Sequence, residues 1–155
     1  MISIRSCVVG MLGTNCYILQ NSTSQVVIDA GGDPEIIVKE LSKSQLPVKS
    51  IVCTHGHYDH IGAIAVLKKK YSVPVYMHEA EKALLEWSFN ECGIEHFAVD
   101  EWLGSSSAPI LSETFKGGQL DVKMMHTPGH TPGCVCFYTD DFIITGDTLF
   151  AEGSW

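Results

Sequence analysis

Positive charge is scarce in this sequence of 155 residues. Ten lysines and arginines stand against eighteen aspartates and glutamates, which gives a net charge of −8 at pH 7. A protein that binds nucleic acid needs a basic face to neutralise phosphates. The composition therefore argues against nucleic acid as a main partner, and against a nuclease in particular.

Long hydrophobic runs are also missing. No stretch approaches the roughly 18 apolar residues that span a bilayer, and residues 1–10 lack the apolar core of a signal peptide. We expect a soluble protein of the cytoplasm with no membrane partner. The length fits one domain over residues 1–155, and 45% hydrophobic residues are enough to bury a core.

The cysteines are too scattered to predict a disulfide framework. They lie within apolar stretches, which is typical of reduced thiols in a protein core. The six are Cys7, Cys16, Cys53, Cys92, Cys134 and Cys136. We expect all of them to be structural.

Alternating apolar patterns and turn residues predict the order of the elements. Strands are expected at 2–9, 15–19, 25–32, 48–53, 73–77, 120–126, 134–138 and 142–145, and helices at 34–46, 61–70 and 79–89. Asp33 is expected to cap the first helix and Pro47 to end it. Residues 91–112 are the hardest to interpret. There we expect a loop at 104–109, with Phe97, Trp102 and Leu103 covering a helix rather than lining a pocket.

A cluster of four potential metal ligands stands between an expected strand and an expected helix. The ligands are His55, His57, Asp59 and His60, within T-H-G-H-Y-D-H at 54–60. Side chains two residues apart in an extended loop point to the same side, so His55 and His57 are able to bind one ion together. Asp59 and His60 would face away from that pair, at the turn into the helix, and hold a second ion. Single loop histidines often have no function, but four such ligands at this spacing predict a metal site.

Two later motifs present further ligands. In T-P-G-H-T-P-G, residues 127–133, two Pro-Gly turns hold His130 on a stiff loop, as suits a preorganised ligand. In T-G-D-T-L-F, residues 145–150, Asp147 follows an expected buried strand. A carboxylate in that position needs a partner, and a cation is a suitable one.

These three motifs together resemble the metallo-β-lactamase superfamily, and above all its glyoxalase II (hydroxyacylglutathione hydrolase) branch. The resemblance implies an α/β fold, the αββα sandwich, with two divalent metal ions. The ions would be zinc, with iron or manganese as alternatives. It implies that His55, His57 and His130 hold the first ion, that Asp59 and His60 hold the second, and that Asp147 bridges both. Asp29, in V-I-D-A-G, would orient a ligand without binding metal.

The resemblance also implies a reaction. A hydroxide bridging the two ions would attack a small-molecule thioester or a related ester, and Asp59 would act as the catalytic residue that orients it. A flavodiiron protein would have Glu where His57 stands, which argues against that relative.

The sequence departs from this family at its end. Superfamily hydrolases supply one more histidine to the second ion from a later segment, and this sequence stops at Trp155. We expect the last strand and helix to be missing and the second site to lack a ligand. His126 is a weak substitute. One ion would then bind, and hydrolysis would be weak or absent. Either the sequence is a fragment or truncated product, or a partner chain, such as a second copy, covers the open edge. Two alternatives to the hydrolase stay open: a truncated, inactive metal-binding module, and a persulfide dioxygenase with a single iron.

Overall fold

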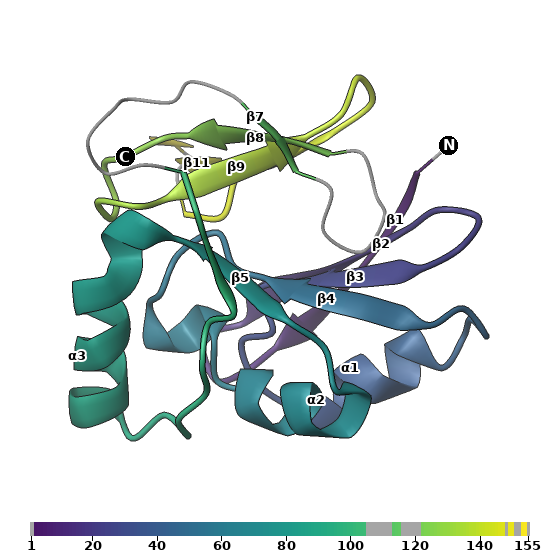
Figure 1. The fold of residues 1–155 in the computed structure, drawn as a ribbon, viewed down its shortest axis with the longest axis horizontal. Helices are drawn as coiled ribbons and strands as arrows, with labels where there is room; N and C mark the ends of the chain where they lie inside the picture. The colour runs from purple at the N-terminus through teal and green to yellow at the C-terminus, as the bar shows by residue number, and fades with distance from the viewer. Residues whose placement is uncertain (1, 105–112, 116–121, 148, 151–152, 155) are drawn as a thin grey trace.

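The computed structural model describes residues 2–104, 113–115, 122–147, 149–150 and 153–154. Within these residues, two β-sheets pack face to face (Figure 1). The first sheet contains, in spatial order, β1 (Ser3–Val9), β2 (Thr14–Gln20), β3 (Gln25–Ile28), β4 (Val48–Val52), β5 (Val75–His78) and β6 (Glu101–Leu103). The second contains β10 (Ile143–Ile144), β9 (Val135–Tyr138), β8 (Val122–His126) and β7 (Glu113–Phe115). A separate short hairpin pairs β11 (Leu149–Phe150) with β12 (Gly153–Ser154).

The helices cover the first sheet. They are α1 (Pro34–Leu41), α2 (Ile64–Tyr71) and α3 (Lys82–Cys92), with 3-10 turns at Tyr58–His60 and Glu79–Glu81. Each α-helix connects two neighbouring parallel strands among β3, β4, β5 and β6. Such connections are right-handed as a rule, so successive connections that proceed in one direction across a sheet place their helices on the same face. Figure 1 shows them on the side away from the second sheet. The predicted α/β fold is confirmed, and in the described residues its layers run helix, sheet, sheet.

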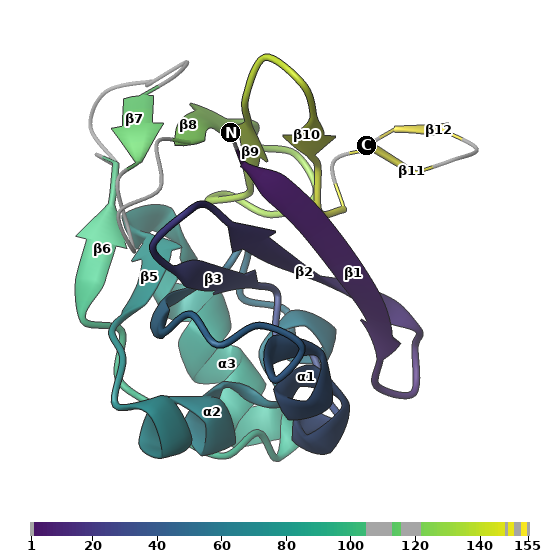
Figure 2. The ribbon, with the colours of Figure 1, turned by 90° about the vertical axis from the view of Figure 1, so that its right-hand side faces the viewer.

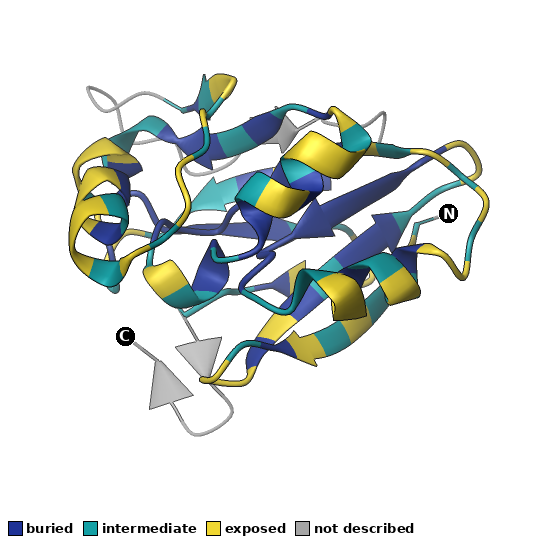
Figure 3. Ribbon diagram, turned by 90° about the horizontal axis from the view of Figure 1, so that it is seen from below, coloured by how far each residue is buried: buried dark blue, intermediate teal, exposed yellow. Residues whose placement is uncertain are grey.

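Alternate residues of the inner strands enter two separate cores. On β3, Val27 faces the helices, whereas Val26 and Ile28 face the second sheet. The helix side also contains Ile37, Leu41, Ile64, Leu67 and Leu85, and the sheet side contains Val122, Met124, Val135 and Phe137. Successive side chains of a strand point to opposite faces, so a strand with every residue buried must be covered on both. Figure 3 shows these buried strands beneath helices whose outer faces are exposed.

The parallel strands β3 and β4 end at the same edge of the first sheet. Ile28 pairs with Val52 at their last residues, and the Asp29 amide donates to the Val52 carbonyl oxygen at 3.0 Å. The loops that follow the two strands are therefore neighbours. Figure 2 shows β2 and β3 side by side, with the helices on one side of the sheet.

Two glycines allow these loops to touch backbone to backbone. A Cβ at Gly31 would overlap the carbonyl oxygen of Asp59, and a Cβ at Gly62 would overlap the carbonyl oxygen of Gly31. No other residue type fits at either position without moving the loop that carries Asp59.

The first helix differs from its prediction at both ends. It ends at Leu41, so the expectation that it continues to Pro47 is wrong. The Gln25 side-chain amide donates to the carbonyl oxygens of Leu41 and Leu46, which satisfies the helix end and turns the chain towards β4. Asp33 stands at the N-cap position but makes no capping hydrogen bond, because its carboxylate accepts the Gly10 amide at 2.9 Å instead.

The region after α3 contains short strands that the sequence pattern did not reveal, namely β6, β7, β11 and β12. Three residues form β6, which pairs in parallel with β5. Phe97 and Trp102 pack against the helix-side core, but they also line a surface pocket beside α3, so the expectation that they do not line a pocket is wrong. The expected loop at 104–109 falls largely outside the described residues. No helix in the described part of the chain has the length and hydropathy to cross a bilayer.

All six cysteines are free thiols, and four of them are buried. The expectation that all six are reduced and structural stays a prediction.

Candidate metal centre

Four separate segments bring the predicted ligands to one place. The loop after β4 carries His55 and His57, and the 3-10 turn that follows carries Asp59 and His60. The loop between β8 and β9 carries His130, and the segment after β10 carries Asp147. All six side chains fall into two groups whose ligand atoms lie within 4.8 Å of one another. Sequence analysis named each member of these groups.

The first group, here the three-histidine group, consists of His55, His57, His130 and Asp147. The His57 Nδ1 atom lies 2.9 Å from His130 Nε2. Asp147 Oδ2 lies 3.0 Å from His130 Nε2 and 3.4 Å from His55 Nε2. Three imidazoles therefore direct one nitrogen each towards a common point, and a carboxylate oxygen completes a four-ligand set.

The second group, here the Asp59 group, shares one carboxylate with the first. His60 Nε2 lies 3.4 Å from Asp59 Oδ2 and 3.3 Å from Asp147 Oδ1. Asp147 thus presents Oδ2 to the three-histidine group and Oδ1 to the Asp59 group. This is the arrangement of a bridging ligand between two ions.

Asp29 fixes which ring nitrogen each histidine presents. Its Oδ1 accepts the Thr54 amide at 2.7 Å, and its Oδ2 accepts the Thr54 hydroxyl at 2.7 Å. Because that hydroxyl proton is directed at Asp29, the Thr54 oxygen accepts from His55 Nδ1, 3.0 Å away. His60 Nδ1 donates directly to Asp29 Oδ2 at 2.9 Å. Both histidines therefore present Nε2 to Asp147. Asp29 thus orients two ligands, which is the role that the sequence resemblance implied for it.

The residues present fit metal ions. His55 Nε2 is fully buried and has no hydrogen-bond partner among the described residues. Because the ring proton is on Nδ1, the lone pair of His55 Nε2 points at a lone pair of the Asp147 carboxylate. A cation between these two atoms would bind both. A set of imidazoles and carboxylates suits zinc, iron or manganese. The Asp59 group has three protein ligands, the number that a catalytic metal site holds while one position stays open.

Charge in the cluster differs between the two groups. Burial lowers the pKa of His57 and of His130, and neighbouring histidines act in the same direction. Burial also opposes charge on His60, but the carboxylates of Asp29 and Asp147 outweigh it and raise the pKa of His60 to about 10. Burial opposes charge on Asp147 too, yet the protonated His60, whose Nε2 lies 3.3 Å from Asp147 Oδ1, holds the pKa of this carboxyl below the ordinary range. At neutral pH the free cluster therefore contains a protonated His60 beside an ionised Asp147.

Metal binding by the Asp59 group is expected to release the His60 proton, because imidazole must be neutral to bind an ion. In the metal-free cluster, affinity for an ion at the Asp59 group should therefore rise with pH above about pH 6.5, whereas His57 and His130 are already neutral and add little. The same raised pKa stabilises the metal-free fold. That contribution is complete below about pH 6.5 and is lost as the pH rises to about 10.

Competition with a chelator at several pH values measures this slope. The variant His60→Gln should remove it. If the metal affinity of the unmodified chain at the Asp59 group does not change with pH, the assignment of the His60 proton is wrong.

Two contacts of the site escaped sequence analysis. The Thr14 hydroxyl lies 3.4 Å from Asp59 Oδ2, and the buried Glu81 carboxylate bonds to both histidine loops. Thr14 and Asp59 are 45 residues apart, and Glu81 lies 25 to 52 residues from its partners. No local pattern marks such contacts.

The remaining histidines lie outside both groups. His126 stacks on His78 with ring centroids 4.2 Å apart, and its Nε2 bonds to the Pro132 carbonyl oxygen. His96 stacks on Phe89. The structure thus does not place His126 as a substitute ligand.

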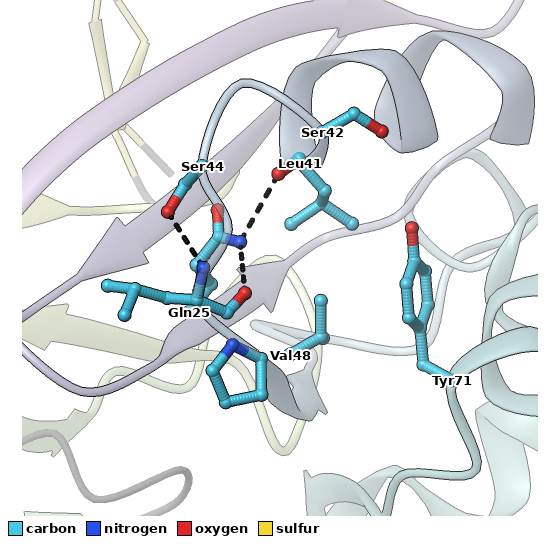
Figure 4. Close-up of a pocket in the computed structure, with 8 residues that line it drawn as sticks. Gln25, Leu41, Ser42, Ser44, Val48 and Tyr71 are labelled. Carbon is cyan, nitrogen blue, oxygen red and sulfur yellow. Dashed lines mark hydrogen bonds between the residues drawn. The ribbon is translucent and has the colours of Figure 1, made fainter.

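A cavity of about 320 Å³ lies at the other end of the first sheet, where β3 and β4 begin (Figure 4). Gln25, Leu41, Ser44 and Val48 line it. The Gln25 side-chain nitrogen donates to backbone carbonyl oxygens, and its side-chain oxygen accepts from Arg5. Among the described residues that line it, Tyr71 is the only titratable one. We therefore assign reaction chemistry to the histidine cluster rather than to this cavity.

Comparison with known proteins agrees with the geometry. The family model described as the metallo-β-lactamase superfamily matches residues 9–155. The chain belongs to the metallo-β-lactamase superfamily. The predicted family is confirmed, and the two ligand groups lie on the three motifs that indicated it.

Relatives within the superfamily carry names of hydrolases. The chain is 32% identical to a probable metallo-hydrolase, YqgX, of Bacillus subtilis, over 94% of this chain and 70% of the relative. It is 30% identical to the hydroxyacylglutathione hydrolase GloC of Haemophilus influenzae, over 90% of this chain and 68% of that protein.

Solved structures share the superfamily fold over nearly the whole chain. The BLEG-1 B3 metallo-β-lactamase superposes with a TM-score of 0.80 at 32% identity, covering 97% of this chain and 74% of that one. TTHA1623 in a di-iron-bound form superposes with a TM-score of 0.75 at 27% identity, covering 97% and 75%.

Proposed function

We propose that the chain is a metal-dependent hydrolase that cleaves a small-molecule thioester or a related ester. The observation that carries the proposal is the pair of ligand groups joined by the two oxygens of Asp147. Similarity to GloC, named a hydroxyacylglutathione hydrolase, supports a thioester substrate. Similarity to TTHA1623 supports iron beside zinc as a metal for this site.

His55, His57 and His130 would hold the first ion, Asp59 and His60 the second, and Asp147 both. Ions bound there would lower the pKa of a coordinated water and polarise the substrate carbonyl group. The thiolate of a thioester is a good leaving group and suits such a reaction.

Residues of the chain supply orientation and proton acceptance. Asp29 and Thr54 keep the ring protons of His55 and His60 on the side away from the centre. Asp59 contacts both Thr14 and His60, and about a fifth of its side chain is exposed. That position suits a carboxylate that orients the attacking oxygen and accepts its proton.

The decisive experiment measures metal content and hydrolysis on the same purified sample. Because the Asp59 group brings three ligand residues together, elemental analysis should find two ions per chain rather than the one expected from the sequence. S-lactoylglutathione should be hydrolysed faster than a simple ester or a β-lactam. The same sample after removal of metal, and the variant His130→Ala, should both be inactive.

Other outcomes would assign the site differently. One ion per chain with no turnover would identify an inactive metal-binding module and overturn the proposal. Iron with oxygen uptake on a glutathione persulfide would identify a dioxygenase. Preferential cleavage of the β-lactam would place the chain with the lactamases. If a dimer appears only in the active fraction, that result would support the prediction that a second copy of the chain covers the β10 edge.

A further inference from the structure

Glu81 is a buried carboxylate that bonds to both loops of the three-histidine group. It stands in the turn before α3 and has no exposed surface. Its Oε1 accepts the Gly56 amide at 2.8 Å and the Thr131 hydroxyl at 2.8 Å. Its Oε2 accepts the Gly133 amide at 2.9 Å. Gly56 separates His55 from His57, and Thr131 follows His130 directly.

The contacts around Glu81 are close and specific. A Cβ at Gly133 would lie 2.7 Å from Glu81 Cγ, so the loop approaches as closely as glycine permits. The next peptide group is held as well, because the Ser88 hydroxyl donates to the Gly56 carbonyl oxygen at 2.8 Å. Each of the two peptide groups between His55 and His57 thus makes a hydrogen bond to a side chain at or within α3.

Burial of this carboxylate is costly, and three donors offset the cost. An ionised carboxylate without partners is expensive in a protein interior. Among the described residues, Glu81 makes no ion pair with Lys, Arg or His. Its hydrogen bonds reach residues 25, 50 and 52 positions away in the sequence. An apolar side chain would fill this space at less cost, but it would leave two buried amides without acceptors.

We propose that Glu81 is a positioning residue for the first metal ion, setting the separation between the loop of His55 and His57 and the loop of His130. The bases of these loops are already joined, since the Val135 amide donates to the Thr54 carbonyl oxygen at 2.9 Å. Glu81 joins them at the ligands, where His57 Nδ1 and His130 Nε2 stand 2.9 Å apart. Metal sites tolerate ligand displacements of only about 0.5 Å, so loss of this brace weakens the site. The inference rests on the proposed metal site and adds the residue that sets its geometry.

The test measures metal binding rather than catalysis. Full-length chains with Glu81→Gln and with Glu86→Gln are stripped of metal, and the affinity for the first Zn²⁺ is measured by competition with a chelator. The visible absorption of the Co²⁺ form reports the geometry around the ion. Glu86 is exposed on α3 and serves as the matched control.

The two variants should differ clearly. The glutamine of Glu81→Gln keeps one oxygen but turns an amide group towards a donor, so we expect about 10- to 100-fold weaker binding and an altered Co²⁺ spectrum. Glu86→Gln should behave as the unmodified chain.

A second pair of variants covers the case in which Glu81→Gln does not fold. Thr131→Val removes one bond to Glu81 and keeps the shape, whereas Thr131→Ser keeps the hydroxyl. The valine variant should bind the first ion about tenfold more weakly and the serine variant normally.

Three results would overturn the inference. The first is a Glu81→Gln chain that is less stable without metal yet binds Zn²⁺ normally and gives an unchanged Co²⁺ spectrum. The second is equal affinity in Thr131→Val and Thr131→Ser. The third is an unmodified chain that binds no metal, which would overturn the proposed function as well. The first two leave the proposed function intact.

Discussion

Replacement of Asp147 by asparagine is expected to reduce kcat/KM for thioester hydrolysis by about 1,000-fold, which corresponds to about 4 kcal/mol of transition-state stabilisation. Asparagine keeps the shape of the side chain but removes its charge and one of its two ligand oxygens. Those oxygens face His130 and His55 on one side and His60 on the other. The variant should therefore retain at most one ion per chain. Steady-state kinetics and elemental analysis of the same preparation check both expectations.

Asp141→Asn is the matched control for this variant. Asp141 is exposed at the turn between β9 and β10 and takes no part in either ligand group. Its variant should keep full activity and metal content. An Asp147→Asn chain that holds two ions and stays within tenfold of normal activity would show that Asp147 is not the bridge.

Replacement of Asp29 by alanine is expected to have the largest effect on stability. The carboxylate is 1% exposed and accepts three hydrogen bonds from Thr54 and His60. Its removal leaves a buried amide and a buried imidazole without partners, which costs about 3 to 5 kcal/mol. Asp29 also has a φ of 58°, a conformation that alanine adopts less readily than aspartate or asparagine. We expect the thermal midpoint to fall by about 10 °C.

Asp33→Ala provides the comparison for this loss. Asp33 has a φ of 46°, and its carboxylate accepts one hydrogen bond, from the Gly10 amide. Both variants carry a similar backbone cost, so the difference between them isolates the buried network of Asp29. Equal midpoints by circular dichroism would contradict that network's role. Asp29→Ala should also weaken metal binding in both groups, because neither His55 nor His60 would be held in its tautomer.

The ligand residues could be predicted from the sequence because most of them lie in one short motif. Four of the six stand within 55–60, where the spacing alone brings them together. His130 and Asp147 are single residues, and only the stiff Pro-Gly loop and the strand end drew attention to them. The structure brings all six into two groups. Their binding of metal stays a prediction for the experiments above.

The contacts that support the ligands could not be predicted in the same way. Glu81 looks like an ordinary acidic residue at a helix start, and nothing near it indicates Gly56 or Gly133. Likewise, the last carbonyl group of α1 accepts a hydrogen bond from Gln25, which lies in β3. A pattern along the helix sequence cannot show such a contact. Such contacts depend on how distant segments pack, and the glycines at 31 and 62 show how closely they do so.

The expected cover of an open edge also stays a prediction. Within the second sheet, β10 is an edge strand, and its residue Ile143 is 54% exposed. Light scattering of the purified chain, with and without metal, would show whether a second copy associates there.

The order of the strands along the chain has a consequence for how the centre comes into being. Residues 3–103 contain every strand of the first sheet, and residues 113–144 contain every strand of the second. His55, His57, Asp59 and His60 therefore belong to the earlier half of the polypeptide, and His130 and Asp147 to the later half. During synthesis, the earlier half leaves the ribosome with only part of a coordination sphere. The centre is completed when the two halves dock, so a captured ion ties the two halves of the chain together.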